Sequence, residues 1–321
     1  MLTSLQFFKT EPKIPFLRFR TIAAGASAIA FVASVLAFTV LGLNFGIDFR
    51  GGTLIEIRTE EPADLAQIRQ TVGGLGLGDV QVQEFGQPTD VLIIVERQRV
   101  SGGTEEENEA AQQAVVDSVK GALNAALSAV EYRRVEVVGG RVSDELRVKG
   151  TIAVTVAVAL MLIYIWLRFE WQFSVGAVLA LVHDVVLTIG IFAVLRIEFN
   201  LSIIAALLTI VGYSMNDTVV IYDRIREKLR KYKKMPLEEL INFALNKTLA
   251  RTLMTSVTTL LALFSLFFLG GEVIRGFTFA MIWGVLIGTY SSLFIAAPFL
   301  LMTGVKRDWS AAQASTVQTG A

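Results

Sequence analysis

The chain has 321 residues, of which 53% are hydrophobic and 18% are charged, with 29 basic and 29 acidic residues that cancel. Soluble domains carry closer to a quarter charged residues, so this composition argues against a soluble protein and favours a membrane protein. The sequence contains no cysteine, which excludes disulfides and thiolate metal sites. It also lacks a Gly-Lys-Ser/Thr phosphate-binding motif, so no nucleotide-driven motor is indicated.

Hydrophobic residues are gathered in runs of about 18 or more that hold few or no charges. At a rise of about 1.5 Å per residue, each run is long enough for a helix that crosses a hydrocarbon core of about 30 Å. The sequence therefore predicts six transmembrane helices. They lie at residues 21–43, 150–167, 173–195, 201–222, 252–269 and 277–303.

Basic residues beside these spans predict the orientation of the chain. Lys and Arg in short flanking loops mark the cytoplasmic side of a membrane protein. Residues 223–251 carry nine basic residues, whereas the loops expected on the opposite side hold only Arg196 and Arg275. We therefore expect both the N-terminal segment (1–20) and the C-terminal tail (304–321) to be cytoplasmic.

The first hydrophobic run, residues 21–43, has an alternative interpretation as a cleaved secretory signal. The apolar region of such a signal is about 7–15 residues long, which is shorter than this run. We therefore expect a retained transmembrane helix.

The basic segment is itself predicted to contain a helix at residues 236–249. Apolar residues recur along one side of it, at Leu237, Leu240, Ile241, Ala244 and Leu245. This pattern is typical of an amphipathic helix that lies at the membrane interface. Residues 150–303 would then form a five-helix bundle that carries a cytoplasmic loop helix.

Residues 44–149 form the one long stretch outside the membrane, and the topology places it on the external side. Alternating and helical periodicities predict the element order βαββαβ, which is that of a ferredoxin-like domain. The fold class is therefore a polytopic α-helical membrane protein with six transmembrane helices and one external α+β domain. The expected elements are strands at 53–58, 80–85, 91–97 and 133–138, and helices at 63–72 and 105–127.

A glycine-rich connector, Asn44–Gly52, joins the first span to the first strand of this domain. Gly46, Gly51 and Gly52 would let the backbone turn sharply where helix gives way to sheet, with Asp48 between them. The composition favours a tight, rigid connector, and the alternative is a hinge that transmits motion of the bundle to the external domain.

Asp217 is the one acidic residue in the fourth span, with Asn216 beside it. An ionisable residue inside a membrane is costly to insert and is therefore a functional candidate. Tyr213 and Ser214 lie one turn earlier, and Gly212 would allow close approach of a neighbouring helix. The alternative is a structural hydrogen bond between helices.

Arg251 begins the fifth span, and a row of threonine and serine residues follows it. Its simplest interpretation is a cytoplasmic anchor. Because Asp217 and Arg251 lie near the same ends of consecutive antiparallel spans, Arg251 is also a candidate counter-ion. Such a pair could hold a proton in one helix arrangement and release it in another.

His183 and Asp184 lie midway along the third span, and His183 is the only histidine. Adjacent residues point about 100° apart on a helix, so they cannot both face one partner. Together with Tyr213 and Ser214, they are candidates either for a proton relay or for hydrogen bonds that hold helices together. In the sixth span, Gly284 and Gly288 form a small-residue face that we interpret as structural.

These residues together resemble the SecF family, membrane subunits of the bacterial SecD–SecF protein-export complex. The stretch from Tyr213 to Thr218, followed by Asp223–Glu227, is highly specific, whereas the glycine motif is shared with SecD. The motifs that carry the resemblance are FGIDFRGG at 45–52, FEW at 169–171, HD at 183–184, VGYSMNDT at 211–218, DRIRE at 223–227, and Arg251-Thr252 with Thr255-Ser256.

The resemblance implies a member of the resistance–nodulation–division superfamily in the bacterial cytoplasmic (inner) membrane. It would supply half of a twelve-helix bundle with SecD and use the proton-motive force to promote preprotein translocation. In the family, the residues that match Asp217 and Arg251 are implicated in proton transport, and a further Asp would come from SecD. The implied partners are SecD, the SecYEG translocon, a translocating preprotein, the lipid bilayer and, as a further candidate, YajC.

No cofactor other than protons, no metal, no catalytic residue and no nucleic acid is implied, so we do not expect an enzyme. Two other functions compete with the proton-coupled one. A small-molecule or lipid exporter of the same superfamily should have twelve spans and two external domains in one chain. A scaffold that only docks neighbours in the translocon would not need a titratable Asp217.

Overall fold

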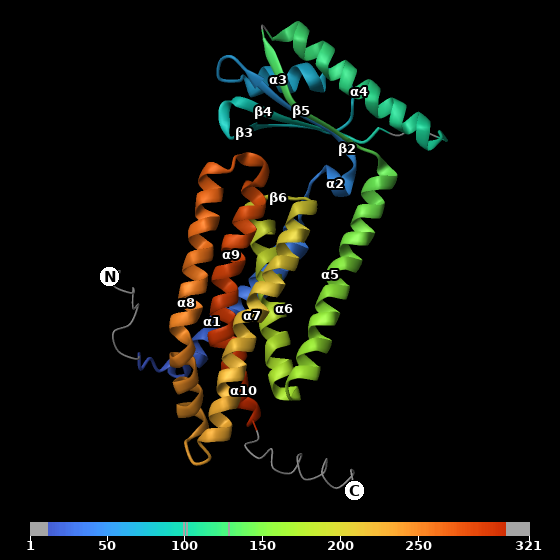
Figure 1. The fold of residues 1–321 in the computed structure, drawn as a ribbon. Helices are drawn as coiled ribbons and strands as arrows, with labels where there is room; N and C mark the ends of the chain where they lie inside the picture. The colour runs from blue at the N-terminus through green and yellow to red at the C-terminus, as the bar shows by residue number, and fades with distance from the viewer. Residues whose placement is uncertain (1–11, 99, 101, 128, 306–321) are drawn as a thin grey trace, which may run out of the picture.

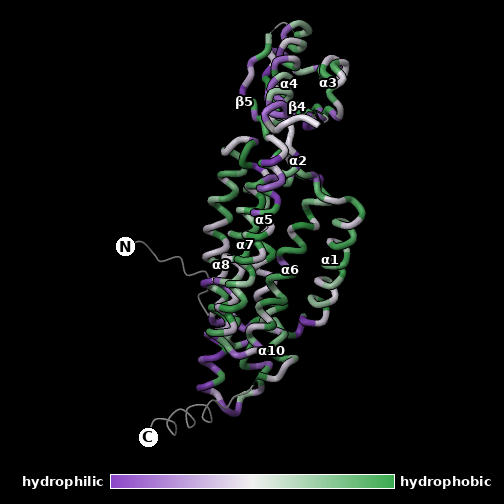
Figure 2. Tube along the Cα trace, turned by 90° about the vertical axis from the view of Figure 1, so that its right-hand side faces the viewer, coloured by the Kyte–Doolittle hydropathy of each residue, from purple (hydrophilic) through white to green (hydrophobic). Residues whose placement is uncertain are grey.

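The computed structural model describes residues 12–98, 100, 102–127 and 129–305. A bundle of long helices carries one small α+β domain at one end (Figure 1). Hydrophobic residues line the long helices, and hydrophilic residues gather in the small domain and at the far end of α7 and α8 (Figure 2). Most of the expected N-terminal segment and nearly all of the tail lie outside the described residues.

Six helices in the described part of the chain are long and apolar enough to span a membrane, which confirms the predicted number. Three of them, α6, α7 and the α9 span, are about half buried, whereas at most 11% of the hydrophobic window of α1, α5 and α8 is buried. The first three therefore form the centre of the bundle. The spans are α1 (Arg20–Leu41), α5 (Gly140–Arg168), α6 (Trp171–Leu195), α7 (Leu201–Lys231), α8 (Leu237–Leu269) and a last span made of α9 (Arg275–Ser291), the π-helical η3 (Ser292–Ala296) and α10 (Ala297–Thr303). The short helices η1 (Phe16–Phe19) and η2 (Glu272–Ile274) precede the first and last spans.

The expected interfacial helix at 236–249 is not a separate element. It forms the first turns of α8, which runs without a break to Leu269. The apolar residues Leu240, Ile241, Ala244 and Leu245 are fully buried in the core cluster that also contains the end of α7. The segment is amphipathic because it packs against α7, whose helix also continues past the expected end of its span.

The external domain has the predicted ferredoxin-like topology. Its sheet order is β3-β4-β2-β5, and every neighbouring pair is antiparallel. Strand β4 begins four residues earlier than predicted, because Gly86, with φ of 85°, is the single residue between β3 and β4. Strand β5 begins three residues earlier than predicted. The elements are β2 (Gly52–Thr59), α3 (Leu65–Gly73), β3 (Val80–Phe85), β4 (Gln87–Glu96), α4 (Glu105–Ala126) and β5 (Val130–Val138).

Strand alternation divides this sheet into two faces. Ile55 and Ile57 of β2 face α3 and α4 and belong to the main core of the domain, whereas Leu54 faces the other way, toward Ile47 and the bundle. Both helices begin at side-chain caps. Asp64 accepts hydrogen bonds from two backbone N–H groups of α3, and Thr104 forms a capping box at the start of α4.

The connector between α1 and β2 is ordered into two short elements. The strand β1 (Asn44–Phe45) pairs in parallel with β6 (Glu198–Phe199), which lies in the turn between α6 and α7. A single helical turn, α2 (Ile47–Arg50), then leads into β2. The external domain is therefore joined to the bundle beside the N-terminus of α7.

Candidate functional site

Helix α7 presents polar side chains on two different faces. Residues four apart share a face of a helix, so Tyr213 and Asp217 point together toward α8. Ser214 and Thr218 form the second row, which faces α6 and the last span. The sequence grouped Tyr213 with Ser214 as relay or packing candidates, and the structure divides the two between separate hydrogen-bond networks.

Asp217 has one hydrogen-bonded and one unsatisfied oxygen. Thr252 Oγ1 of α8 donates to Asp217 Oδ1 at 2.6 Å. Asp217 Oδ2 is buried and has no hydrogen-bond partner among the described residues. A buried carboxylate with one oxygen left without a hydrogen bond is poorly stabilised as an anion, and a proton on the carboxyl group would remove this buried charge. The carboxyl group is therefore a candidate proton-binding site.

Arg251 does not contact Asp217 in this arrangement. Its side chain is exposed, and no ion pair joins it to Asp217 in the described part of the chain, although its charge acts on that carboxyl group through space. The direct partner is Thr252, which sequence reasoning assigned only to a general polar face. Asn216 is also exposed and lies away from the Thr252 contact.

Tyr213 extends the polar contacts along the same face of α7. Its hydroxyl donates to Ser256 Oγ at 3.2 Å, and Ser256 Oγ lies 2.8 Å from Thr289 Oγ1. This chain of hydroxyl groups connects α7, α8 and α9. It stabilises the region around Asp217 without contacting its carboxyl group.

Asp184 is the centre of the second network, and each of its carboxyl oxygens has a partner. Ser214 Oγ and Ser291 Oγ donate to Asp184 Oδ2 at 2.6 and 2.7 Å. His183 Nδ1 lies 3.0 Å from Asp184 Oδ1, so the two adjacent side chains meet although they leave the helix in different directions. His183 Nε2 is buried without a hydrogen-bond partner among the described residues.

Small residues let the last span approach α7 closely, as predicted. A Cβ atom on Gly288 would lie 3.1 Å from Ser214 Cβ, and one on Gly284 would collide with Ile210. Thr218 Oγ1 and Ser292 Oγ are 2.8 Å apart across the same contact. Gly212 behaves differently, because no atom lies within 4 Å of its Cβ position. The close approach predicted at Gly212 is therefore absent.

The glycine-rich connector is held on both sides. Gly46 N donates to Phe199 O at 3.0 Å, and a Cβ at Gly46 would collide with the Glu198 carboxylate. Asp48 Oδ2 accepts a hydrogen bond of 2.8 Å from Leu201 N, the first residue of α7. Gly51 and Gly52 have φ of 72° and 132°, values that favour glycine. The connector is thus in close contact with the start of α7 on one side and with β2 on the other.

Metal ligands are not gathered anywhere in the described residues: no group of three or more His, Cys, Asp or Glu side chains is placed to hold an ion.

Two family models match this chain. Protein export membrane protein SecD/SecF, C-terminal, matches residues 118–306, and the SecD/SecF GG motif matches residues 36–63. The protein translocase subunit SecF of Rhodobacter capsulatus is 44% identical over 313 residues, which cover 96% of this chain and 94% of the relative. The protein translocase subunit SecF of Magnetococcus marinus is 51% identical over 300 residues, which cover 93% of this chain and 94% of the relative.

The chain belongs to the SecF family. Its fold agrees with that of solved SecDF proteins. A crystal structure of SecDF, a translocon-associated membrane protein from Thermus thermophilus, matches with a TM-score of 0.81 and 32% identity, over 92% of this chain and 39% of that chain. A crystal structure of SecDF in a super-membrane-facing form matches with a TM-score of 0.64 and 31% identity, over 98% of this chain and 41% of that chain. The SecF chain therefore spans about two fifths of each solved SecDF chain, and family membership gives it a SecF-like role in protein export.

Proposed function

We propose that this SecF-like subunit uses the proton-motive force, together with SecD, to promote preprotein translocation across the bacterial cytoplasmic membrane and release on the outer side. The observation that carries the proposal is the unsatisfied oxygen of Asp217 inside a membrane-length helix. A membrane potential supplies about 2.3 kcal/mol per elementary charge per 100 mV. Protons moving through this carboxyl group could therefore drive a change in helix arrangement without a nucleotide or another cofactor.

Arg251 and Thr252 offer Asp217 two alternative partners. A hydroxyl group can hydrogen-bond to a carboxyl group in either protonation state, whereas a guanidinium group is favoured beside the charged carboxylate. We infer that the Thr252 contact belongs to one state and that a shift of α8 brings Arg251 to Asp217 in another. Loss of the proton would favour the arginine contact, and gain of the proton would favour the threonine contact.

Partners are inferred from the chemistry and size of the family complex. The exposed spans α1, α5 and α8 leave room for a second membrane subunit, and the solved SecDF chains are more than twice as long as this one. SecD would supply the missing carboxyl group of the proton pathway. SecYEG, the preprotein and YajC are further proposed partners, with both termini of this chain in the cytoplasm.

The decisive experiment replaces Asp217 by Asn in the complex with SecD, because this change keeps the size of the side chain and removes the titratable proton. We expect normal assembly of the complex, loss of proton flux, and loss of the part of export that depends on the proton gradient. Export is measured in vesicles that contain the translocon, with and without a gradient.

A second variant is Arg251→Lys, which keeps the positive charge and removes the planar guanidinium group with its paired N–H donors. We expect it to retain assembly but to reduce gradient-dependent export. Unchanged export in the Asp217→Asn variant would favour a scaffold that only binds neighbouring subunits. Unchanged export in the Arg251→Lys variant would indicate that Arg251 acts only as a positively charged membrane anchor. The competing exporter function is disfavoured because the chain belongs to the SecF family, whose named relatives are protein translocase subunits.

A further inference from the structure

The N-terminus of α7 is capped by a side chain from a distant part of the sequence. Asn200 occupies the capping position, but its Oδ1 accepts from Ser202 Oγ at 2.6 Å, and its side chain caps no backbone N–H. Asp48 of α2 takes this role by accepting from Leu201 N. A helix N-terminus has unpaired N–H groups and a partial positive charge, so a carboxylate there satisfies both the hydrogen bonding and the electrostatics.

The connector around Asp48 is fastened to the turn between α6 and α7. Arg196 Nη1 donates to Leu41 O at 2.8 Å and to Gly42 O at 3.0 Å, and Asn44 Nδ2 donates to Arg196 O at 3.1 Å. Phe49 is buried, and its ring centroid lies 6.0 Å from that of Phe199. These contacts make the connector move together with the start of α7.

On its other side, the connector leads directly into the centre of the external sheet. Only three residues separate Asp48 from Gly52, the first residue of β2. Gly52 pairs with both Glu96 and Val138, and a Cβ atom there would lie 2.5 Å from Val95 O. Because β2 is paired on both edges, a force applied at its first residue reaches the whole sheet.

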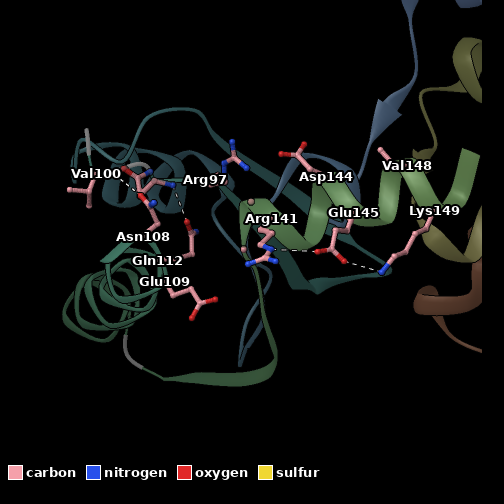
Figure 3. A pocket seen from close by; sticks show the side chains of 13 residues that line it. Arg97, Val100, Asn108, Glu109, Gln112, Arg141, Asp144, Glu145, Val148 and Lys149 are labelled. Carbon is pink, nitrogen blue, oxygen red and sulfur yellow. Dashed lines mark hydrogen bonds and ion pairs between the residues drawn. The ribbon is translucent and has the colours of Figure 1, made fainter. Parts of the chain in front are cut away.

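The external domain is also joined to the bundle where β5 leads through Gly139 into α5, and its β3–β4 turn at Gly86 lies against Glu272 of η2. A cavity of about 720 Å³ separates the start of α4 from the first turns of α5, as Figure 3 shows. Gln112 and Asn108 line its α4 side, and Arg141 and Glu145 line its α5 side. A second cavity of about 280 Å³ lies between the inner face of the sheet and the α8–α9 turn. Both cavities leave space beside the contacts between the domain and the bundle.

We propose that Asp48 is a positioning residue that couples the proton site to the external domain. Helix α7 is continuous from Leu201 to Asp217, a distance of about 24 Å along its axis. A displacement of α7 at Asp217 moves its N-terminus, and the Asp48–Leu201 bond passes that movement to β2. The connector thus acts as a rigid linker that the Asp48 hydrogen bond attaches to α7, rather than as a flexible hinge. This inference rests on the proposed proton-coupled function.

The test compares Asp48→Ala and Asp48→Asn in the full complex with SecD, reconstituted with the translocon in vesicles. Asp48→Ala should leave proton flux intact and lower gradient-dependent export by about fivefold or more, the change in an equilibrium that loss of a helix cap produces. Asp48→Asn retains an acceptor oxygen and should recover most of the export. Arg50→Ala, an exposed charge on the same helical turn, is the matched control and should behave as the wild type.

Two results would overturn the coupling role. One is wild-type export in Asp48→Ala, and the other is an equal fall of proton flux and export, which indicates a general structural defect. Asp217→Asn in the same assay separates the two hypotheses: if it does not change export, the proton function fails whatever Asp48 does.

A distance measurement between the external domain and the bundle tests the role of Asp48 in the connector independently of proton flux. Because the chain has no cysteine, spin labels can be placed at Ser118→Cys in α4 and Val273→Cys in η2, which are both exposed. We expect the distance distribution between the labels to broaden in Asp48→Ala and to return toward wild type in Asp48→Asn. An unchanged distribution in Asp48→Ala contradicts the proposal.

Discussion

The two carboxyl groups inside the bundle have opposite hydrogen-bonding states. Both oxygens of Asp184 have partners, whereas one oxygen of Asp217 has none among the described residues. A buried acceptor left without a partner costs about 1–3 kcal/mol. The Asp184 carboxyl group therefore joins α6, α7 and α9, and Asp217 is the candidate proton-binding group. This favours the packing interpretation of Asp184 over the relay.

At this scale we predict a difference between two neighbouring serines that are both fully buried. Ser291 donates to the Asp184 carboxyl group, and Ser292 contacts the neutral Thr218 hydroxyl. Hydrogen bonds to a charged group are about twice as strong as neutral ones. Ser291→Ala should lower the free energy of unfolding by about 2–3 kcal/mol, and Ser292→Ala by about 1 kcal/mol. Chemical unfolding in detergent measures both, and equal losses would indicate that Asp184 is neutral.

Among the elements, α7 and α8 reach past the predicted membrane boundary as a packed antiparallel pair. The side of α8 that looks like a membrane-interface surface in sequence is buried against the end of α7. An apolar stripe has the same period whether it faces lipid or another helix, so the pattern could not separate the two. Most basic residues at the end of this pair are exposed, but Lys228 is buried, with its ammonium group over the rings of Tyr232 and Phe243.

Truncation of this buried stripe should destabilise the bundle. Leu245→Ala removes a fully buried side chain and is expected to cost about 2–5 kcal/mol. Leu237→Ala, at a partly exposed position of the same helix, is the matched control and should cost less. Thermal or chemical unfolding of the purified protein distinguishes them. Similar small losses for both would support an interfacial helix instead.

In the whole molecule, the external domain meets the bundle around Glu198. Burial raises the pKa of this carboxyl group, the negative charges of Asp48 and Glu136 raise it further, and Arg134 opposes the shift. Glu198, Glu272 and Arg275 all line the cavity of about 280 Å³ between the sheet and the α8–α9 turn. A proton on Glu198 therefore stabilises the contact between the two parts of the molecule.

This contact should depend on external pH. A carboxyl group whose pKa is raised by docking stabilises the docked arrangement fully below the ordinary glutamate pKa, and that stability is lost as the pH rises through the raised value. We expect the label pair at Ser118→Cys and Val273→Cys to show a narrower distance distribution at pH 5 than at pH 8. Glu198→Gln should remove the dependence, and Glu84→Gln, an exposed carboxyl on β3, should retain it.

How much the sequence predicts differs between the fold and the site. Long hydrophobic runs and strand alternation are local signals, so six spans and the βαββαβ order follow from them. Asp217 could also be found, because a carboxyl group in an apolar run stands out. Its partner could not, since Arg251 and Thr252 are adjacent and only the rotation of α8 about its axis decides which one faces α7.

The sequence by itself determined the membrane class, the number of spans, the external ferredoxin-like domain and the candidate carboxyl groups, because each depends on composition or short-range periodicity. Only the tertiary structure decided which polar groups meet. The contact of Ser214 with Asp184, the cap that Asp48 places on α7 and the burial of the first turns of α8 join segments that are far apart in the chain. Such contacts depend on the packing of whole helices, and no local pattern records them.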